Sequence, residues 1–131
     1  MNNNVKHWLR KAENDLISVE HELSFPKEEI ITDTVCFHAQ QAVEKFLKAF
    51  LILNNYEFGN THNLEYLLQL CGKFDKSILQ YELGNLSSYA VNVRYPDDYY
   101  VTDYEDAVEA FNLAKTIKEK ILLKIKGEND E

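Results

Sequence analysis

The sequence predicts an all-α fold, an up-and-down bundle of four to five helices that is expected to form dimers. Apolar residues recur at steps of three and four along most of the 131 residues, which is the period of an amphipathic helix. Only four glycines and two prolines are present, too few for the many tight turns of an all-β fold. No segment shows the alternation of a strand, so helices must bury their apolar faces against one another.

A proline separates the first two predicted helices. Residues 5–23 carry one apolar stripe, and Pro26 ends this pattern because proline lacks an amide donor and disfavours helix in the residue before it. The second helix is predicted over residues 28–54 and is the longest. Its apolar residues cover far more than one stripe, which is typical of a helix in the middle of a bundle or in a dimer interface.

Two shorter helices are predicted next. Thr61 is expected to cap a helix that Gly72 ends. Residues 75–93 carry leucine, alanine and valine at four-three spacing, which predicts a fourth helix that stops before Pro96. We expect a two-fold dimer interface built in part from the second and fourth helices, with Arg94 near the two-fold cleft.

A fifth helix follows, with Thr102 or Asp103 as its N-cap. Lysines crowd its C-terminal end, where they oppose the negative pole of the helix dipole. The chain has no internal repeat and no linker that would divide it. One helical domain is therefore expected over residues 5–125, followed by a frayed tail over residues 126–131.

Composition excludes several classes of function. The net charge of −8 argues against broad, sequence-blind binding of nucleic acid, but it leaves room for a local site for one nucleotide or one RNA loop. Cys36 and Cys71 lie in apolar patterns without metal-ligand spacing, as expected of free thiols in a reducing cytoplasm. The longest apolar run, residues 49–53, is too short to cross a bilayer, and no signal peptide is seen. We expect a cytoplasmic protein without cofactor, metal or membrane contact.

Arg94 is the first candidate for a functional residue. It is one of two arginines in an acidic chain, and it is followed by Tyr95, Pro96 and Asp97. A guanidinium is planar and permanently charged, and it suits a phosphate or a carboxylate. An ion pair between Arg94 and Asp97 or Asp98 explains the same pattern about equally well.

The second predicted helix supplies further candidates. His38, Gln41, Lys45 and Lys48 recur at steps of three and four and so share one face. Such a strip suits a phosphate and a base edge, but the solvated side of an amphipathic helix has the same spacing. His62 lies at the start of the next helix, where amide donors attract anions, although a structural histidine is the more frequent case at such a position.

Residues 97–106 hold five acidic residues and three tyrosines, and no basic residue. The central glycine of a calcium loop is missing. The segment is either a surface loop with an acidic first helical turn or an acidic, tyrosine-rich surface that binds a basic surface of a partner protein.

Several motifs, taken in order, resemble the HEPN domain, in the form of a small stand-alone prokaryotic protein. The motifs are FHAQQAVEKFLKA at residues 37–49, THNL at residues 61–64 and RYPD at residues 94–97, and the resemblance covers residues 5–125. It implies a helical bundle, a homodimer, nucleotide binding and a minimal nucleotidyltransferase encoded nearby, often as a toxin–antitoxin pair. Many members are metal-independent ribonucleases whose arginine is followed four to six residues later by a histidine.

The sequence departs from that ribonuclease pattern. The window after Arg94 holds Tyr99, Tyr100 and Val101, and no histidine follows His62. A tyrosine with its ordinary pKa near 10 is a poor proton carrier at neutral pH. The resemblance therefore predicts a non-catalytic nucleotide-binding and partner module that acts with a nucleotidyltransferase.

Two alternatives stay open. One is a ribonuclease toxin that uses Arg94 with His38 or His62 in place of the missing histidine. The other is nucleotidylation of a tyrosine by the partner enzyme, with Tyr99, Tyr100 and Tyr104 as candidates. For the binding module, the expected ligand-binding residues are Gln41, Lys45, Lys48, His62, Arg94 and Asp97.

Overall fold

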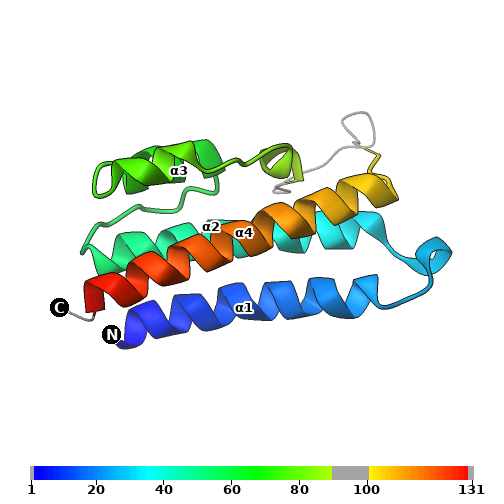
Figure 1. Ribbon diagram of the computed structural model, residues 1–131, viewed down its shortest axis with the longest axis horizontal. Helices are drawn as coiled ribbons and strands as arrows, with labels where there is room; N and C mark the ends of the chain where they lie inside the picture. The colour runs from blue at the N-terminus through cyan, green and yellow to red at the C-terminus, as the bar shows by residue number, and fades with distance from the viewer. Residues whose placement is uncertain (1, 90–100, 130–131) are drawn as a thin grey trace.

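Three long helices lie side by side along the length of the molecule (Figure 1). They are α1 (Asn3–Leu23), α2 (Thr32–Leu53) and α4 (Tyr104–Asn129), and the short helix α3 (Leu64–Gly72) packs on α2. The structure is a computed structural model that describes residues 2–89 and 101–129. Over those residues it is all-helical and contains no strand, which confirms the predicted fold class.

Helix α2 is the centre of the bundle. Helices α1 and α4 pack along it, and α3 and a short turn over Leu86–Tyr89 (η3) also contact it. No residue of α2 is exposed, and most of its side chains are buried. The prediction of a central helix is confirmed, and one chain is enough to cover α2. The extent of its apolar surface is therefore no argument for a dimer interface on this helix.

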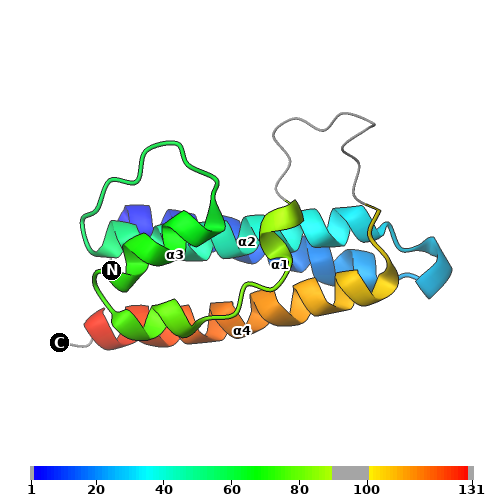
Figure 2. The same cartoon turned by 90° about the horizontal axis from the view of Figure 1, so that it is seen from above.

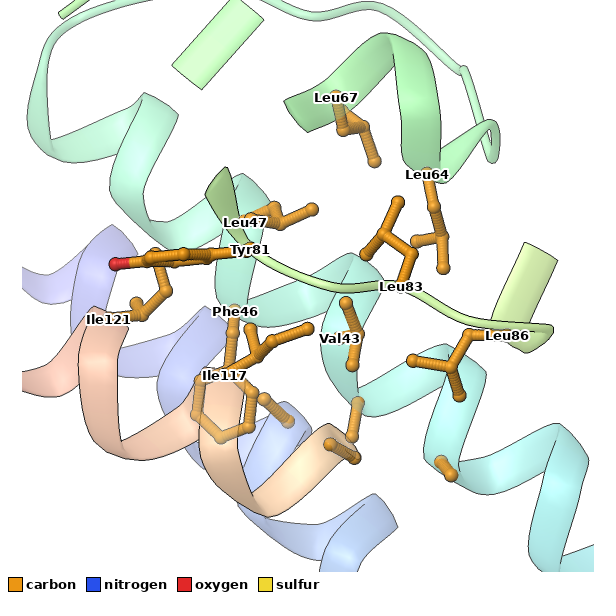
Figure 3. Close-up of a cluster of buried hydrophobic side chains, with 14 of the residues drawn as sticks. Val43, Phe46, Leu47, Leu64, Leu67, Tyr81, Leu83, Leu86, Ile117 and Ile121 are labelled. Carbon is orange, nitrogen blue, oxygen red and sulfur yellow. The ribbon is translucent and has the colours of Figure 1, made fainter. Parts of the chain in front are cut away.

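The core joins all the layers of the bundle, and Figure 3 shows the part of it between α2, α3 and α4. Phe46 and Phe50 of α2 are fully buried at its middle. Figure 3 shows side chains from α2, from α3, from the segment after α3 and from α4 converging on one cluster: Val43, Phe46, Leu47, Leu64, Leu67, Tyr81, Leu83, Leu86, Ile117 and Ile121. Burial of this many large apolar side chains is the main contribution to stability.

The predicted fourth helix over residues 75–93 is wrong for the residues that the structure describes. A 3₁₀ turn over Lys76–Gln80 (η2) and η3 are joined by an extended segment and a turn at Gly84. Gly84 has a φ of +51°, which no α-helix contains. In the extended segment Tyr81 and Leu83 are buried while Glu82 between them is exposed. Buried and exposed side chains thus alternate here, as they do in extended chain and not in a helix.

The start of α2 also differs from the prediction. Lys27–Glu29 forms a separate 3₁₀ turn (η1) after Pro26, and α2 begins only at Thr32. The amide of Ile31 donates to Glu22 Oε2 at 3.1 Å, which holds the chain extended between the two helices.

Helix α3 is capped by Asn63 and not by Thr61. Asn63 Oδ1 accepts from the amide of Tyr66 at 3.0 Å, while Thr61 Oγ1 accepts from the amide of Asn63 at 3.2 Å. The predicted end of this helix at Gly72 is confirmed. Asparagine ranks above threonine as an N-cap, so propensity favours the residue that caps α3 in the structure.

Asp103 caps α4 by a reciprocal pair of hydrogen bonds. Its Oδ1 accepts from the amide of Asp106 at 2.8 Å, and Asp106 Oδ2 accepts from the amide of Asp103 at 3.0 Å. The helix continues to Asn129, beyond the predicted domain end at residue 125. None of the helices in the described part of the chain combines the length and the apolar composition needed to cross a membrane.

Candidate functional site

The predicted site residues fall into two groups. Gln41, Lys45 and Lys48 lie on α2, and His62 lies in the loop just before α3. Arg94 and Asp97, together with Tyr99 and Tyr100, lie outside the described residues, so the structure neither joins them to the α2 strip nor separates them from it.

Asp15 of α1 joins two residues of the α2 strip. Its Oδ1 lies 2.9 Å from His38 Nδ1, and its Oδ2 accepts from Lys45 Nζ at 2.6 Å. His38 and Lys45 are seven residues apart, about two helical turns, so one carboxylate between them reaches both. Asp15 is only 8% exposed, and a buried carboxylate needs such partners.

Asp15 was missed by the sequence analysis. Its signal was an acidic residue inside the apolar stripe of α1, between Ala12 and Val19 and next to Leu16. An acid at a core position requires a cationic or hydrogen-bonding partner from a neighbouring helix, and the histidine and lysines of α2 were the available candidates.

The contact with Asp15 orients the imidazole of His38. A carboxylate at Nδ1 favours the tautomer with the proton on that nitrogen, which leaves Nε2 as the outward nitrogen. In the described part of the chain Nε2 has no hydrogen-bond partner, and the side chain of His38 is 32% exposed. Nε2 is therefore available to accept a proton or, once protonated, to donate to an anion.

A cavity of about 350 Å³ adjoins His38. Its walls come from the first half of α2, from η3 and from the start of α4: Asp33, Thr34, Cys36, Phe37, His38, Tyr89 and Thr102. Tyr89 and Thr102 lie close to the two ends of the segment that holds Arg94. The chain thus leaves and re-enters the described structure at this cavity.

Hydrogen bonds fix one wall of the cavity. Thr102 Oγ1 donates to Asp33 Oδ1 at 2.6 Å and lies 2.7 Å from Thr32 Oγ1. These contacts tie the chain just before α4 to the first turn of α2. The thiol of Cys36 lies in the wall, but burial raises its pKa to about 12, so it is protonated at neutral pH and is no nucleophile.

A second ionic cluster lies further along α2, around Glu44. This carboxylate is 2% exposed; it accepts from Lys48 Nζ at 3.2 Å, and His62 Nδ1 lies 3.1 Å from both its oxygens. The Lys48 ammonium also lies 5.5 Å from the centre of the Trp8 ring and 5.1 Å from that of Phe58. Such cation–π contacts stabilise a cation withdrawn from water.

The burial of Lys48 separates it from His38, Gln41 and Lys45, the other residues of the predicted strip on α2. The Lys48 side chain is 5% exposed, so its burial favours a structural role over contact with a ligand. His62 is turned toward Glu44 and Asn63 caps α3, so the structural reading of His62 explains its position. His38, Gln41 and Lys45 remain at the half-buried outer face of α2.

Two adjacent amides complete the site. Gln41 Nε2 donates to Gln40 Oε1 at 2.7 Å. Gln40 is fully buried, and its Nε2 has no hydrogen-bond partner in the described structure. An unsatisfied buried amide of this kind costs about 1–3 kcal/mol. No group of acidic, histidine and cysteine side chains in the described ranges could hold a metal ion.

Comparison with known proteins fits this fold. The family model described as the HEPN domain matches residues 5–125. The chain belongs to the HEPN family. The crystal structure of ST0689, an archaeal HEPN homologue, is similar to this HEPN protein at 25% sequence identity and a TM-score of 0.61, over 95% of this chain and 99% of that one. No curated protein matches the chain.

Proposed function

We propose that this HEPN protein is a non-catalytic module of the cytoplasm that binds a nucleotide and acts with a nucleotidyltransferase as one half of a toxin–antitoxin pair. The observation that carries the nucleotide-binding part is the outer face of α2. There Lys45, the free nitrogen of His38 and the amide of Gln41 are partly exposed, with His38 at the edge of a cavity.

The residues of this face suit different parts of a nucleotide. Lys45 and a protonated His38 can donate to phosphate oxygens, and Gln41 can pair with a base edge. Asp15 already pairs with both cationic groups, so a phosphate must share them with a carboxylate. The side chains of Asp15, His38 and Lys45 together carry one net positive charge when the imidazole is protonated and no net charge when it is neutral. Binding is therefore expected to be modest.

The non-catalytic part of the proposal is supported by the sequence. No histidine follows His62, so the arginine-to-histidine motif of the family's ribonucleases is incomplete. The net charge of −8 also disfavours a long RNA substrate and favours a basic protein surface as partner.

Calorimetric titration with ATP, GTP and inorganic phosphate tests nucleotide binding. We expect Lys45→Met to weaken binding of the preferred nucleotide about tenfold and Lys45→Arg to restore most of it, because a charge-assisted hydrogen bond contributes about 1.5–3 kcal/mol. Lys11→Met, on the exposed side of α1, is the matched control and should change nothing. Equal binding by the wild type and Lys45→Met, with both folded, contradicts the assignment.

Co-purification tests the partner. The proposal requires a nucleotidyltransferase gene beside this one. When the two genes are co-expressed with an affinity tag on one chain only, the nucleotidyltransferase should elute with the HEPN protein in a fixed ratio. Failure of the two proteins to associate counts against the pairing but leaves the nucleotide titration as an independent result.

One observation favours a second candidate, a metal-independent ribonuclease. Asp15 orients His38 as an acid orients the histidine base in hydrolytic enzymes, and the outward nitrogen is unoccupied. In this candidate His38 Nε2 would take the proton from a ribose 2′-hydroxyl while that oxygen attacks the adjacent phosphate. The bond from phosphorus to the 5′-oxygen breaks, a 2′,3′-cyclic phosphate forms, and the leaving 5′-oxygen takes a proton from water. The candidate requires Arg94 to steady the phosphate.

A further inference from the structure

A groove lies between α4 and the chain that leads from α3 to η3, which runs beside α4 in Figure 2. Its volume is about 580 Å³, and Tyr81, Leu113 and Ile117 belong to its apolar floor. On α4 its lining residues form one stripe from residue 104 to residue 120, a length of about 24 Å. A groove this long and this small in volume has room for a single extended chain and not for a helix about 10 Å wide.

Groups that can pair with a peptide backbone line this groove. Glu82 lies in extended chain, and neither its amide nor its carbonyl has a hydrogen-bond partner in the part of the chain that the structure describes. The exposed side-chain amides of Gln80 and Asn112 also line the groove and bond to no other described residue. A side-chain amide carries a donor and an acceptor, as a peptide group does. These groups can therefore satisfy the main chain of an extended peptide, as in strand addition.

Opposite charges mark the two ends of the groove. Glu105 and Glu109 line it near the start of α4, and among the described residues they have no ion-pair partner. Lys120 lines the other end, eleven residues after Glu109 and about 16 Å further along the axis. Its ammonium lies 5.2 Å from the centre of the Tyr81 ring and stays exposed. The groove thus presents carboxylates at one end and an ammonium at the other.

We propose that this groove binds a short apolar peptide with free ends in an extended conformation. The N-terminal ammonium of the peptide lies at Glu105 and Glu109, and its C-terminal carboxylate lies at Lys120. An extended chain rises about 3.3 Å per residue, so five residues span the distance from Glu109 to Lys120. The first, third and fifth side chains of such a peptide share one face and pack on the apolar floor.

The order of the charges disfavours other elongated ligands. A polyamine would place a cation against Lys120, and a fatty acid would leave Glu105 and Glu109 without a partner. The same two carboxylates, together with Glu82, repel a nucleotide or an RNA strand. The peptide site lies on α4 and uses no residue of the α2 face, so it is independent of nucleotide binding.

Nuclear magnetic resonance titration with the pentapeptide Leu-Ser-Val-Ser-Leu tests the proposal. We expect this peptide, with both ends free, to shift the backbone amide signals of the α4 residues that line the groove. The same peptide with an acetylated N-terminus and an amidated C-terminus should bind about tenfold more weakly. It loses two exposed ion pairs, and one such pair changes affinity by about threefold to fivefold. The tripeptide Val-Ser-Leu should also bind more weakly because it is too short to reach both ends.

Two variants test the assignment of the ends. Glu109→Gln and Lys120→Gln should each weaken binding of the free-ended pentapeptide about threefold and leave binding of the blocked peptide unchanged, which loss of structure would not do. Glu119→Gln, at an exposed position of α4 outside the groove, is the matched control and should bind as the wild type does. Circular dichroism checks that each variant is folded.

Two results overturn the proposal. One is the absence of any shift in the groove at millimolar pentapeptide, and the other is equal binding of the free-ended and blocked peptides. Lys45→Met, which tests the nucleotide site on α2, should leave peptide binding intact. Failure of the peptide site can therefore be told apart from failure of nucleotide binding.

Discussion

Asp15 shows how one side chain converts a stripe of polar residues into a site. Its carboxylate holds His38 and Lys45 in fixed positions, and the burial of this acid makes the pairing necessary. Without Asp15 the two cationic side chains would be independent groups on a helix surface. With it, the imidazole has one occupied and one available nitrogen, which is the property that both candidate functions use.

Asp15→Asn should lower the free energy of unfolding by about 1–3 kcal/mol. The amide keeps the shape of the side chain but leaves His38 and Lys45 without their negative partner. Urea denaturation measures the change. Glu20→Gln on the exposed side of α1 is the control and should alter stability by less than about 0.5 kcal/mol. Equal stability of Asp15→Asn and the wild type would mean that the cluster contributes nothing to folding.

Cys36 and Cys71 should be unreactive in the native protein. Burial raises the pKa of each thiol to about 12, so very little thiolate forms at pH 8. A colourimetric thiol reagent should detect almost no free thiol before denaturant is added and two per chain afterwards. Fast native labelling of either cysteine contradicts its place in the core.

The same thiols make stability fall at alkaline pH. Each folded-state pKa, about 12, lies above the ordinary value of 9.0, so the folded state holds its proton more tightly than the unfolded chain. The stabilisation is complete below pH 9 and is lost as the pH rises toward 12. Urea midpoints measured from pH 8 to pH 10.5 should decrease, and Cys36→Ala with Cys71→Ala should flatten that decrease.

At the scale of elements, periodicity predicted the three long helices and the central position of α2. It failed over residues 75–89, because leucines at four-three spacing in the sequence also fit a chain that turns and then runs extended. The decisive residue is Gly84, whose left-handed backbone breaks any helix. The Asp15 cluster could not be predicted from spacing on α2 alone, since its third member comes from α1.

Gly84→Ala should destabilise the protein by about 1–3 kcal/mol. Its φ is +51°, and an added Cβ would lie 2.7 Å from Leu113 Cδ1. Gly127→Ala is the matched substitution in α4, where a Cβ meets nothing within 4 Å, and it should be neutral or slightly stabilising because alanine favours helix. Thermal melts of the two variants show whether each substitution lowers or raises the stability of the protein. A neutral Gly84→Ala would contradict the turn that separates η2 from η3.

At the scale of the whole molecule, the bundle places its two candidate surfaces on different helices. The ionic cluster and its cavity lie along α1 and α2, while the groove lies along α4. The order of the three long helices followed from the sequence. The groove did not, because it lies beside residues 80–82, where periodicity predicted an α-helix that the structure does not contain.

The most direct measurement of the central claim is incubation of total cellular RNA with the purified protein, beside Arg94→Ala and His38→Asn variants prepared identically. A non-catalytic module predicts that none of the three shortens the RNA, while the wild type still binds a nucleotide by calorimetry. RNA cleavage by the wild type that both variants lose would contradict that claim and identify a ribonuclease in which His38 replaces the missing histidine.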